Sequence, residues 1–338
     1  MAQPPTTPVR LKDIARDLNV SVMTVSKVVR GCADVGAETR GRVMAKIKEL
    51  NYQPNWVARS LAARRTFIIG LIVPDLMHSF FAEIAKGVSA TIRPLGYDVV
   101  ICNSEEDGEF ESSEVDRLLA RQVDGLLIAS AQPPSHLALF ERIEARGVPY
   151  VLVDRRFPDS HAPYVGADDE AIGRLATSHL IERGCRRVAH LAGRMLAPGT
   201  GRLKGYRDAL AAAGISVPDS YVEHATDDAS GYEAARRLLA LNPRPDGIFG
   251  YNDPTAAGAM KAILEAGIRI PEAIKVIGVG NVHYSDLLRV PLSTIDQSST
   301  AIGQQAADML VKAIGSKRRK PARTVLIDPV LIARESTR

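Results

Sequence analysis

The chain has 338 residues, 46% of them hydrophobic and 24% charged, and a formal net charge of +4. This is the balance of a globular protein, and the length exceeds that of one small domain, so we expect two or three compact units. Scattered cysteines, with no CxxC pair and no histidine cluster, predict neither a disulfide framework nor a metal site, and the lack of a signal peptide or a long apolar run predicts a cytoplasmic protein without a membrane partner.

The positive charge is concentrated at the start of the chain. Residues 1–66 hold twelve Lys and Arg against five Asp and Glu, whereas the remainder holds 31 against 34. A basic head on a slightly acidic body indicates a polyanion partner for the head only. A basic surface that is merely solvated is the alternative.

The head begins with two short helices separated by a tight corner. In "LKDIARDL", residues 11–18, the apolar side chains fall at i, i+3, i+4 and i+7, which is one face of a helix. Asn19-Val20 leaves room only for a tight turn, and Ser21 can cap a second helix. Two helices joined this closely are typical of a helix-turn-helix.

The second helix has two different faces. Val25, Val28 and Val29 form a plausible buried stripe, and the opposite face combines apolar side chains with cations. Such a face suits the major groove of DNA, because apolar atoms meet thymine methyl groups and a cation meets guanine or phosphate. A small helical bundle that binds protein is the alternative. The mixed face consists of Val22, Met23, Ser26, Lys27 and Arg30.

A third helix, at about residues 38–51, is expected to close the small core of the head. The segment "NYQPNWVARSLAARRT" follows it, and there Asn55 can cap a helix of about two turns that ends at Arg64-Arg65. A helix this short is marginal alone. We therefore expect the segment to order only on DNA or against its copy in a second subunit.

From Phe67 onward, apolar strands alternate with helices, for example at residues 80–95 and 169–183. This alternation predicts parallel sheets covered on both faces, and two sheets rather than one. Ligand binding then falls at the carboxyl ends of the strands, in a cleft between two lobes. The predicted strands are residues 67–73, 97–103, 124–130, 148–154, 187–193, 246–252 and 274–280.

Polar side chains directly follow several of these strands, and two phenylalanines follow the first. Together on one edge they predict a site for a small hydroxylated ligand, although any one of them could instead cap the next helix. These residues are Asp75, Phe80, Phe81, Ser130, Asp154, Arg155, Asn252, Asp253 and Asn281.

The head resembles that of the lactose/galactose repressor family, in "LKDIARDLNVSVMTVSKVV" followed by "ELNYQPNWVARSLAARR". By that resemblance Val22, Met23 and Lys27 read bases from the recognition helix. Thr24 and Ser26 fall where phosphate contacts are expected.

The resemblance also assigns the hinge. Leu61 would wedge into the minor groove at the operator centre and kink it, with Ala62 touching the groove floor beside it. Two positions depart from the family pattern. Arg30 stands where Asn is usual and could add a phosphate contact, and Gly36 replaces a capping Ser.

The body resembles the family's effector domain, so that about residues 9–334 are covered in all. The implied fold is an all-α helix-turn-helix head with a hinge helix, followed by an α/β two-lobed body similar to a periplasmic binding protein. Gly280 and Asn281 replace two acids that the family often has, which favours an anionic or larger effector. The implied effector contacts are His78, Phe80, Phe81, Asp154, Arg202, Asn252 and Gln297, to which the strand-end pattern adds Ser130 and Asn281.

Of these residues Arg202 is the strongest candidate, since one guanidinium can hold a carboxylate or two hydroxyls in a fork.

The predicted domains are the head at 1–53, the hinge at 54–65 and the body at 66–338. Because the chain should cross between lobes three times, the N-lobe is expected at about 66–163 and 294–324, and the C-lobe at about 164–293 and 325–338.

The resemblance implies a sequence-specific repressor of a catabolic operon. It would bind a palindromic double-stranded DNA operator and be switched by a small sugar-like or sugar-acid effector, with no other cofactor. No heptads follow the last strand, so a homodimer is expected, which supplies two heads for a palindrome.

Two rival functions are less well supported. An enzyme is disfavoured because "GVGNVHYS" has His283 at the third glycine position of a dinucleotide loop and "GTGRLKG" lacks the ending of a phosphate loop. A solute-binding protein without a DNA function would fit the body alone, but the basic head and the missing signal peptide argue against it.

Overall fold

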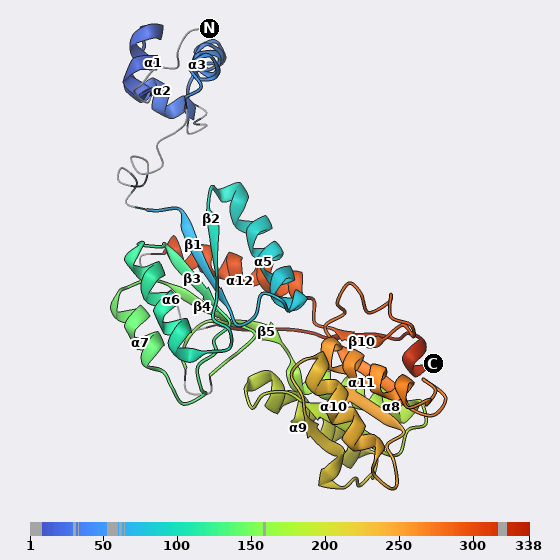
Figure 1. Ribbon diagram of the computed structural model, residues 1–338. Helices are drawn as coiled ribbons and strands as arrows, with labels where there is room; N and C mark the ends of the chain where they lie inside the picture. Colours follow the sequence, from blue (N-terminus) through green and yellow to red (C-terminus); the bar gives the residue numbers. More distant parts are fainter. Residues whose placement is uncertain are drawn as a thin grey trace. The chain divides into compact units, whose positions relative to one another are not determined.

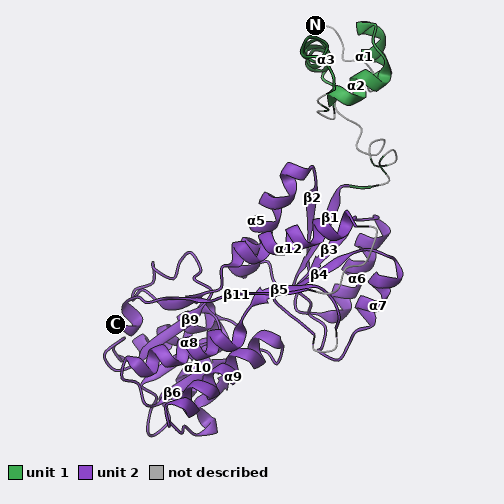
Figure 2. Ribbon diagram, turned by 180° about the vertical axis from the view of Figure 1, so that it is seen from behind, with its two compact units in different colours: residues 1–66 green, residues 67–338 purple. Residues whose placement is uncertain are grey.

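The computed structural model describes residues 9–29, 32, 34–52, 60, 63, 65–157, 160–316 and 323–338. The chain divides into two compact units, residues 1–66 and 67–338, which Figure 2 distinguishes by colour. Arg30, Leu61 and Ala62 lie outside the described residues, as does most of the expected hinge helix.

The first unit contains three described helices, α1 (Leu11–Leu18), α2 (Val22–Val29) and α3 (Ala37–Glu49), drawn in blue in Figure 1. The corner between α1 and α2 is tight because Asn19 adopts the left-handed conformation, with φ 53°. Ser21 Oγ then accepts the Thr24 N–H at 3.0 Å and caps α2. The predicted helix-turn-helix is confirmed. Its core is Ile14, Ala15, Val25, Val28 and Val43.

The second unit is built on two sheets, each six-stranded in the described part of the chain, with orders β11-β5-β4-β3-β1-β2 and β12-β10-β9-β8-β6-β7. All paired strands are parallel except β10 and β12. Central strands such as β3, β4 and β8 are buried at every position, which explains their continuous apolar sequences. The strands are β1 (Ile68–Val73), β2 (Asp98–Asn103), β3 (Gly125–Ile128), β4 (Tyr150–Val153), β5 (Tyr164–Ala167), β6 (Val188–Ala192), β7 (Val222–His224), β8 (Gly247–Gly250), β9 (Lys275–Val279), β10 (Ser293–Asp296), β11 (Thr324–Ile327) and β12 (Val330–Ile332).

Helices cover both faces of each sheet. In the N-lobe, α5 and α12 pack together on one face, and α6 and α7 cover the other (Figure 1). In the C-lobe, α8 pairs with α9 and α10 pairs with α11. The helices are α5 (Ser79–Ile92), α6 (Gly108–Ala120), α7 (Ala138–Ala145), α8 (Asp169–Glu182), α9 (Ala197–Ala212), α10 (Asp228–Leu239), α11 (Asp253–Glu265) and α12 (Ser299–Ile314), with 3₁₀ turns at Arg93–Leu95, Asp219–Tyr221 and Glu335–Thr337.

The predicted lobe boundaries were placed too early in the chain. Strand β5 pairs with β4 and β11 pairs with β5, so residues 164–167 and 324–327 belong to the N-lobe sheet. Strand β10 pairs with β9, so residues 293–296 belong to the C-lobe sheet. The three crossings therefore follow β5, β10 and β11. The sequence did not reveal this because each of these strands is only four residues long.

No described helix is long and apolar enough to span a membrane. Within the same residues, no group of three or more His, Cys, Asp or Glu side chains is arranged to hold a metal ion.

We expect Gly173→Ala to destabilise the protein, because a Cβ at this position of α8 would lie 2.2 Å from the carbonyl oxygen of Arg202 on α9. Overpacking of this kind typically costs about 1–3 kcal/mol. The free energy of unfolding in urea measures the effect. Gly41→Ala in α3 meets nothing within 4 Å and should be neutral or stabilising by up to about 1 kcal/mol. Equal stability of the two variants would contradict the close contact.

Candidate DNA-binding and ligand-binding sites

The recognition helix α2 has the two faces that its sequence predicts. Val25 and Val28 are buried, whereas Val22 and Met23 are 47% and 62% exposed. Both exposed side chains are therefore available to contact the edges of bases, and their roles as base readers remain predictions.

The polar groups of α2 already have partners in the free chain. Thr24 Oγ1 lies 2.8 Å from Ser21 Oγ, and Ser26 also makes a polar interaction. Lys27 Nζ lies 2.5 Å from Oδ2 of Asp34. Sequence reasoning did not single out Asp34, which lies in the segment between α2 and α3.

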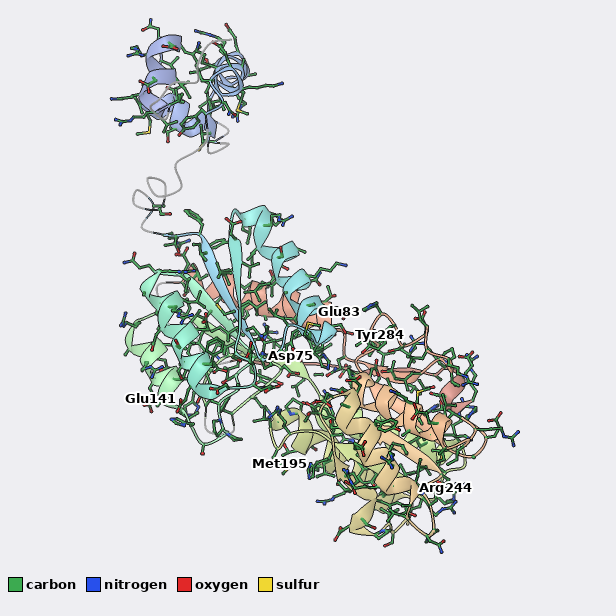
Figure 3. The ribbon with its side chains drawn as sticks, viewed as in Figure 1. Asp75, Glu83, Glu141, Met195, Arg244 and Tyr284 are labelled. Atoms are coloured by element: carbon green, nitrogen blue, oxygen red, sulfur yellow. The ribbon has the colours of Figure 1, made fainter. Side chains whose placement is uncertain are left out.

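The second site is a cavity between the two lobes of the body. Its lining residues follow the carboxyl ends of strands from both sheets, and Figure 3 labels one of them, Asp75, where the lobes meet. Seven of the predicted effector contacts converge there: His78, Phe80, Phe81, Asp154, Arg202, Asn252 and Gln297. The other lining residues are Asp75, Glu106, Arg155, Arg194, Thr226 and Tyr251.

Ser130 and Asn281 are not among the residues that line the cavity, and their contact with the effector stays a prediction. Ser130 Oγ donates to Glu111 at 2.6 Å and accepts the Gln132 N–H at 3.1 Å. Asn281 Oδ1 accepts from Arg334 at 2.7 Å. Each polar group secures the loop after its own strand, and neither residue caps a described helix, which was the alternative that the sequence left open.

Arg202 is fixed by three hydrogen bonds to different parts of the body. Its Nε donates to Asp169 Oδ1 at 3.0 Å, one Nη to the Tyr251 carbonyl at 2.7 Å, and the other to Gln297 Oε1 at 2.6 Å. The guanidinium also lies over the Tyr251 ring, 4.8 Å from its centroid. A ligand therefore meets a guanidinium whose position is already set.

Asp154 is a buried carboxylate at the end of β4, in the left-handed conformation with φ 63°. Within the described part of the chain, no hydrogen bond reaches its carboxylate, and its ion pair with Arg155 is long, at 3.9 Å. Burial raises the pKa of Asp154 to about 7, Asp169 adds to the rise, and the Arg155 guanidinium opposes it. The carboxylate is therefore an open hydrogen-bond acceptor inside the cavity.

Glu106, which sequence reasoning missed, connects cations of both lobes. It receives two hydrogen bonds from Arg155 of its own lobe, at 2.6 and 2.7 Å, and lies 3.9 Å from Arg194 of the C-lobe. Burial opposes its ionisation, yet the bonds from Arg155 hold the pKa of Glu106 below its usual range. Four cavity residues that sequence reasoning missed share a position after a strand, and this shared position was the signal that could have found them. They are Glu106, Arg194, Thr226 and Tyr251.

His78 bridges the lobes directly. It caps α5 by accepting the Phe80 N–H at 3.3 Å through Nδ1, and its Nε2 lies 3.2 Å from Nδ2 of Asn252, the N-cap of α11. Burial lowers the pKa of His78, so the ring is neutral at neutral pH. The Asn252 amide is oriented by its bond from the Thr255 N–H.

A helix-turn-helix head joined to a two-lobed α/β body with a polar cleft defines a ligand-responsive DNA-binding protein. Two family models match the chain: "Bacterial regulatory proteins, lacI family" over residues 10–55, and "Periplasmic binding proteins and sugar binding domain of LacI family" over residues 66–335. The chain belongs to the lacI family of bacterial regulatory proteins. It is a transcriptional repressor that binds DNA through its head.

Relatives match over nearly the whole chain. The ribose operon repressor of Halalkalibacterium halodurans is 34% identical and the transcriptional repressor PurR of Pectobacterium carotovorum is 36% identical, each covering 96–97% of both chains. The solved structure of the Lac repressor bound to ONPG in the repressed state has a TM-score of 0.84 and 30% identity, over 98% of this chain and 100% of that one. Because these matches include the head, they favour a repressor over a solute-binding protein.

We expect Asp154→Asn to stabilise the protein near neutral pH. The folded-state pKa of about 7 lies above the usual 3.8, so the folded chain binds this proton more tightly than the unfolded chain. Ionisation therefore lowers the free energy of unfolding as the pH rises from about 4 to 7, by roughly 2–4 kcal/mol. The amide removes this loss, and Asn tolerates the left-handed backbone.

Thermal unfolding from about pH 4 to 8 measures this effect. Asp208→Asn, at an exposed position of α9, is the control and should retain the pH dependence of the wild type. The same pH dependence in Asp154→Asn and the wild type would contradict the assignment.

Proposed function

We propose that the protein is a cytoplasmic homodimeric repressor that binds a pseudo-palindromic operator of a catabolic operon and is switched by a sugar or sugar acid in the interlobe cavity. It catalyses no reaction in this proposal. The proposal that a ligand binds in the cavity rests on the buried Asp154 carboxylate. This carboxylate lines the cavity and accepts no hydrogen bond from the described residues.

The polar chemistry of the cavity supports a hydroxylated, acidic ligand. A hydroxyl of the ligand would donate to Asp154. Arg194 keeps about half of its side chain exposed, and the nearest carboxylate oxygen, on Glu106, is 3.9 Å from its Nε, so it can bind a carboxylate. The solved complex of the regulator CelR with cellobiose, at 30% identity and a TM-score of 0.74, is a further reason to expect a sugar.

The aromatic side chains of the cavity supply apolar faces for a sugar ring. Phe80 and Phe81 pack edge to face, with centroids 5.1 Å apart, and each also contacts the His78 ring. Rings arranged in this way leave an edge or a face toward the cavity, against which the C–H groups of a sugar can pack.

The cavity must change when a ligand enters. Its volume is about 70 Å³, well below the roughly 300–1,000 Å³ of common ligand pockets. A sugar therefore has to displace side chains that now join the lobes, including the His78–Asn252 contact. Binding that exchanges protein contacts for ligand contacts favours one lobe arrangement over another, which is the requirement for a switch.

A thermal-shift screen of the full chain against sugars, sugar acids and nucleosides tests the ligand class. Operator binding is then measured with each ligand that raises the melting temperature. Couplings in switches of this kind are typically about 1–3 kcal/mol, so operator affinity should change by roughly 5- to 150-fold. Ligands that stabilise the body but leave operator affinity unchanged would contradict the switch.

Asp154→Asn should weaken binding of the same ligand by about 10- to 100-fold, because a hydrogen bond to a charged acceptor is lost. Ligand-free operator binding should stay within about twofold, since Asp154 belongs to the body. Asp208→Asn, at an exposed position outside the cavity, is the matched control and should bind ligand normally. Equal losses in both variants would place the ligand elsewhere.

A further inference from the structure

The DNA-facing cation of the head has an acidic partner. Lys27 Nζ on α2 lies 2.5 Å from Asp34 Oδ2, and the two side chains are 38% and 55% exposed. Met23 is also exposed and lies four residues before Lys27, so both stand on one face of the helix. The ion pair is therefore part of the surface that α2 presents.

Stability does not explain this ion pair. Exposed pairs of this type contribute little to folding, because water screens the charges and two long side chains must be ordered. The core of the head is built from other residues, including Ile14, Val25 and Val43. A carboxylate beside the groove also repels DNA phosphates, so Asp34 lowers the general attraction of the head for DNA.

The two groups match the major-groove edge of a G·C base pair. Guanine presents the acceptors O6 and N7, which suit an ammonium group, and cytosine presents the N4 amino group, which suits a carboxylate. Guanine O6 and cytosine N4 lie side by side, since they are hydrogen-bonded to each other. A Lys and an Asp in contact present the complementary donor and acceptor side by side as well.

We propose that Asp34 is a specificity-determining residue and that the Lys27–Asp34 pair recognises one G·C base pair in each operator half-site. Lys27 donates to guanine O6 or N7, and Asp34 accepts from cytosine N4. The Asp34 carboxylate also offsets the positive charge of Lys27. The attraction of Lys27 to the phosphates of non-specific DNA is therefore weaker. This inference rests on the proposed operator binding through α2.

The full-length wild type first selects its preferred sequence from random duplexes. Affinities are then measured for operators substituted at each half-site position, and for random-sequence duplex at several salt concentrations. Asp34→Asn keeps the size of the side chain but removes its charge. It should reduce discrimination at one G·C position by about tenfold. Random-sequence duplex should bind more tightly. The plot of log affinity against log salt concentration should be steeper by about one unit per head.

Two variants serve as controls. Glu49→Gln removes the same charge from an exposed glutamate of α3, whose Oε1 lies 2.8 Å from Nζ of the half-buried Lys46, and should leave base preference unchanged at every position. In a Lys27→Ala background, Asp34→Asn should reduce discrimination at the G·C position by a different factor than in the wild type, because the effects of contacting residues are not additive.

An unchanged base preference in Asp34→Asn overturns the proposal, whatever happens to non-specific affinity. A wild type that selects no sequence would instead overturn operator binding itself, so the two failures are distinguishable. Should Asp34→Asn fail to fold in thermal unfolding, Asp34→Ala tests the same position. It also removes the carboxylate, and an unaltered preference at the G·C position in that variant overturns the proposal.

Discussion

The ligand-binding body depends on one buried guanidinium. Burying a charge costs several kcal/mol unless it is paired and hydrogen-bonded, and Arg202 meets this requirement with Asp169, the Tyr251 carbonyl and Gln297. The partners belong to α8, to the end of β8 and to the crossing that follows β10. Because Gln297 lies at a lobe crossing, a change in lobe angle must alter the bonds of Arg202.

The close approach of α8 and α9 makes this network possible. Gly173 and Gly205 lie where a Cβ would meet the backbone of the facing helix at 2.2 Å, so the two helices pack with little space between them. That contact brings Arg202 of α9 within hydrogen-bonding distance of Asp169 at the start of α8. The electrostatics of the cleft thus rest on small residues that carry no charge.

Much of the architecture could be predicted from sequence. The face made by residues 11–18, the corner at Asn19 and the cap at Ser21 are local features, and they correctly indicated a helix-turn-helix. The long apolar runs correctly indicated the central strands. The short strands β5 and β11 were assigned to the wrong lobe, because they pair with each other although they lie far apart in the sequence.

The sequence by itself determined which residues follow the strands, and parallel sheets bring the carboxyl ends of strands to one edge, so six of the cleft residues could be named from this pattern. The resemblance to the repressor family named His78, Arg202 and Gln297. Only the tertiary structure decided what each side chain bonds. It directs Ser130 to Glu111 and Asn281 to Arg334, and it brings Glu106 to Arg155, 49 residues away in the chain. A hydrogen bond requires positions correct to a fraction of an ångström, and the packing of whole lobes sets those positions.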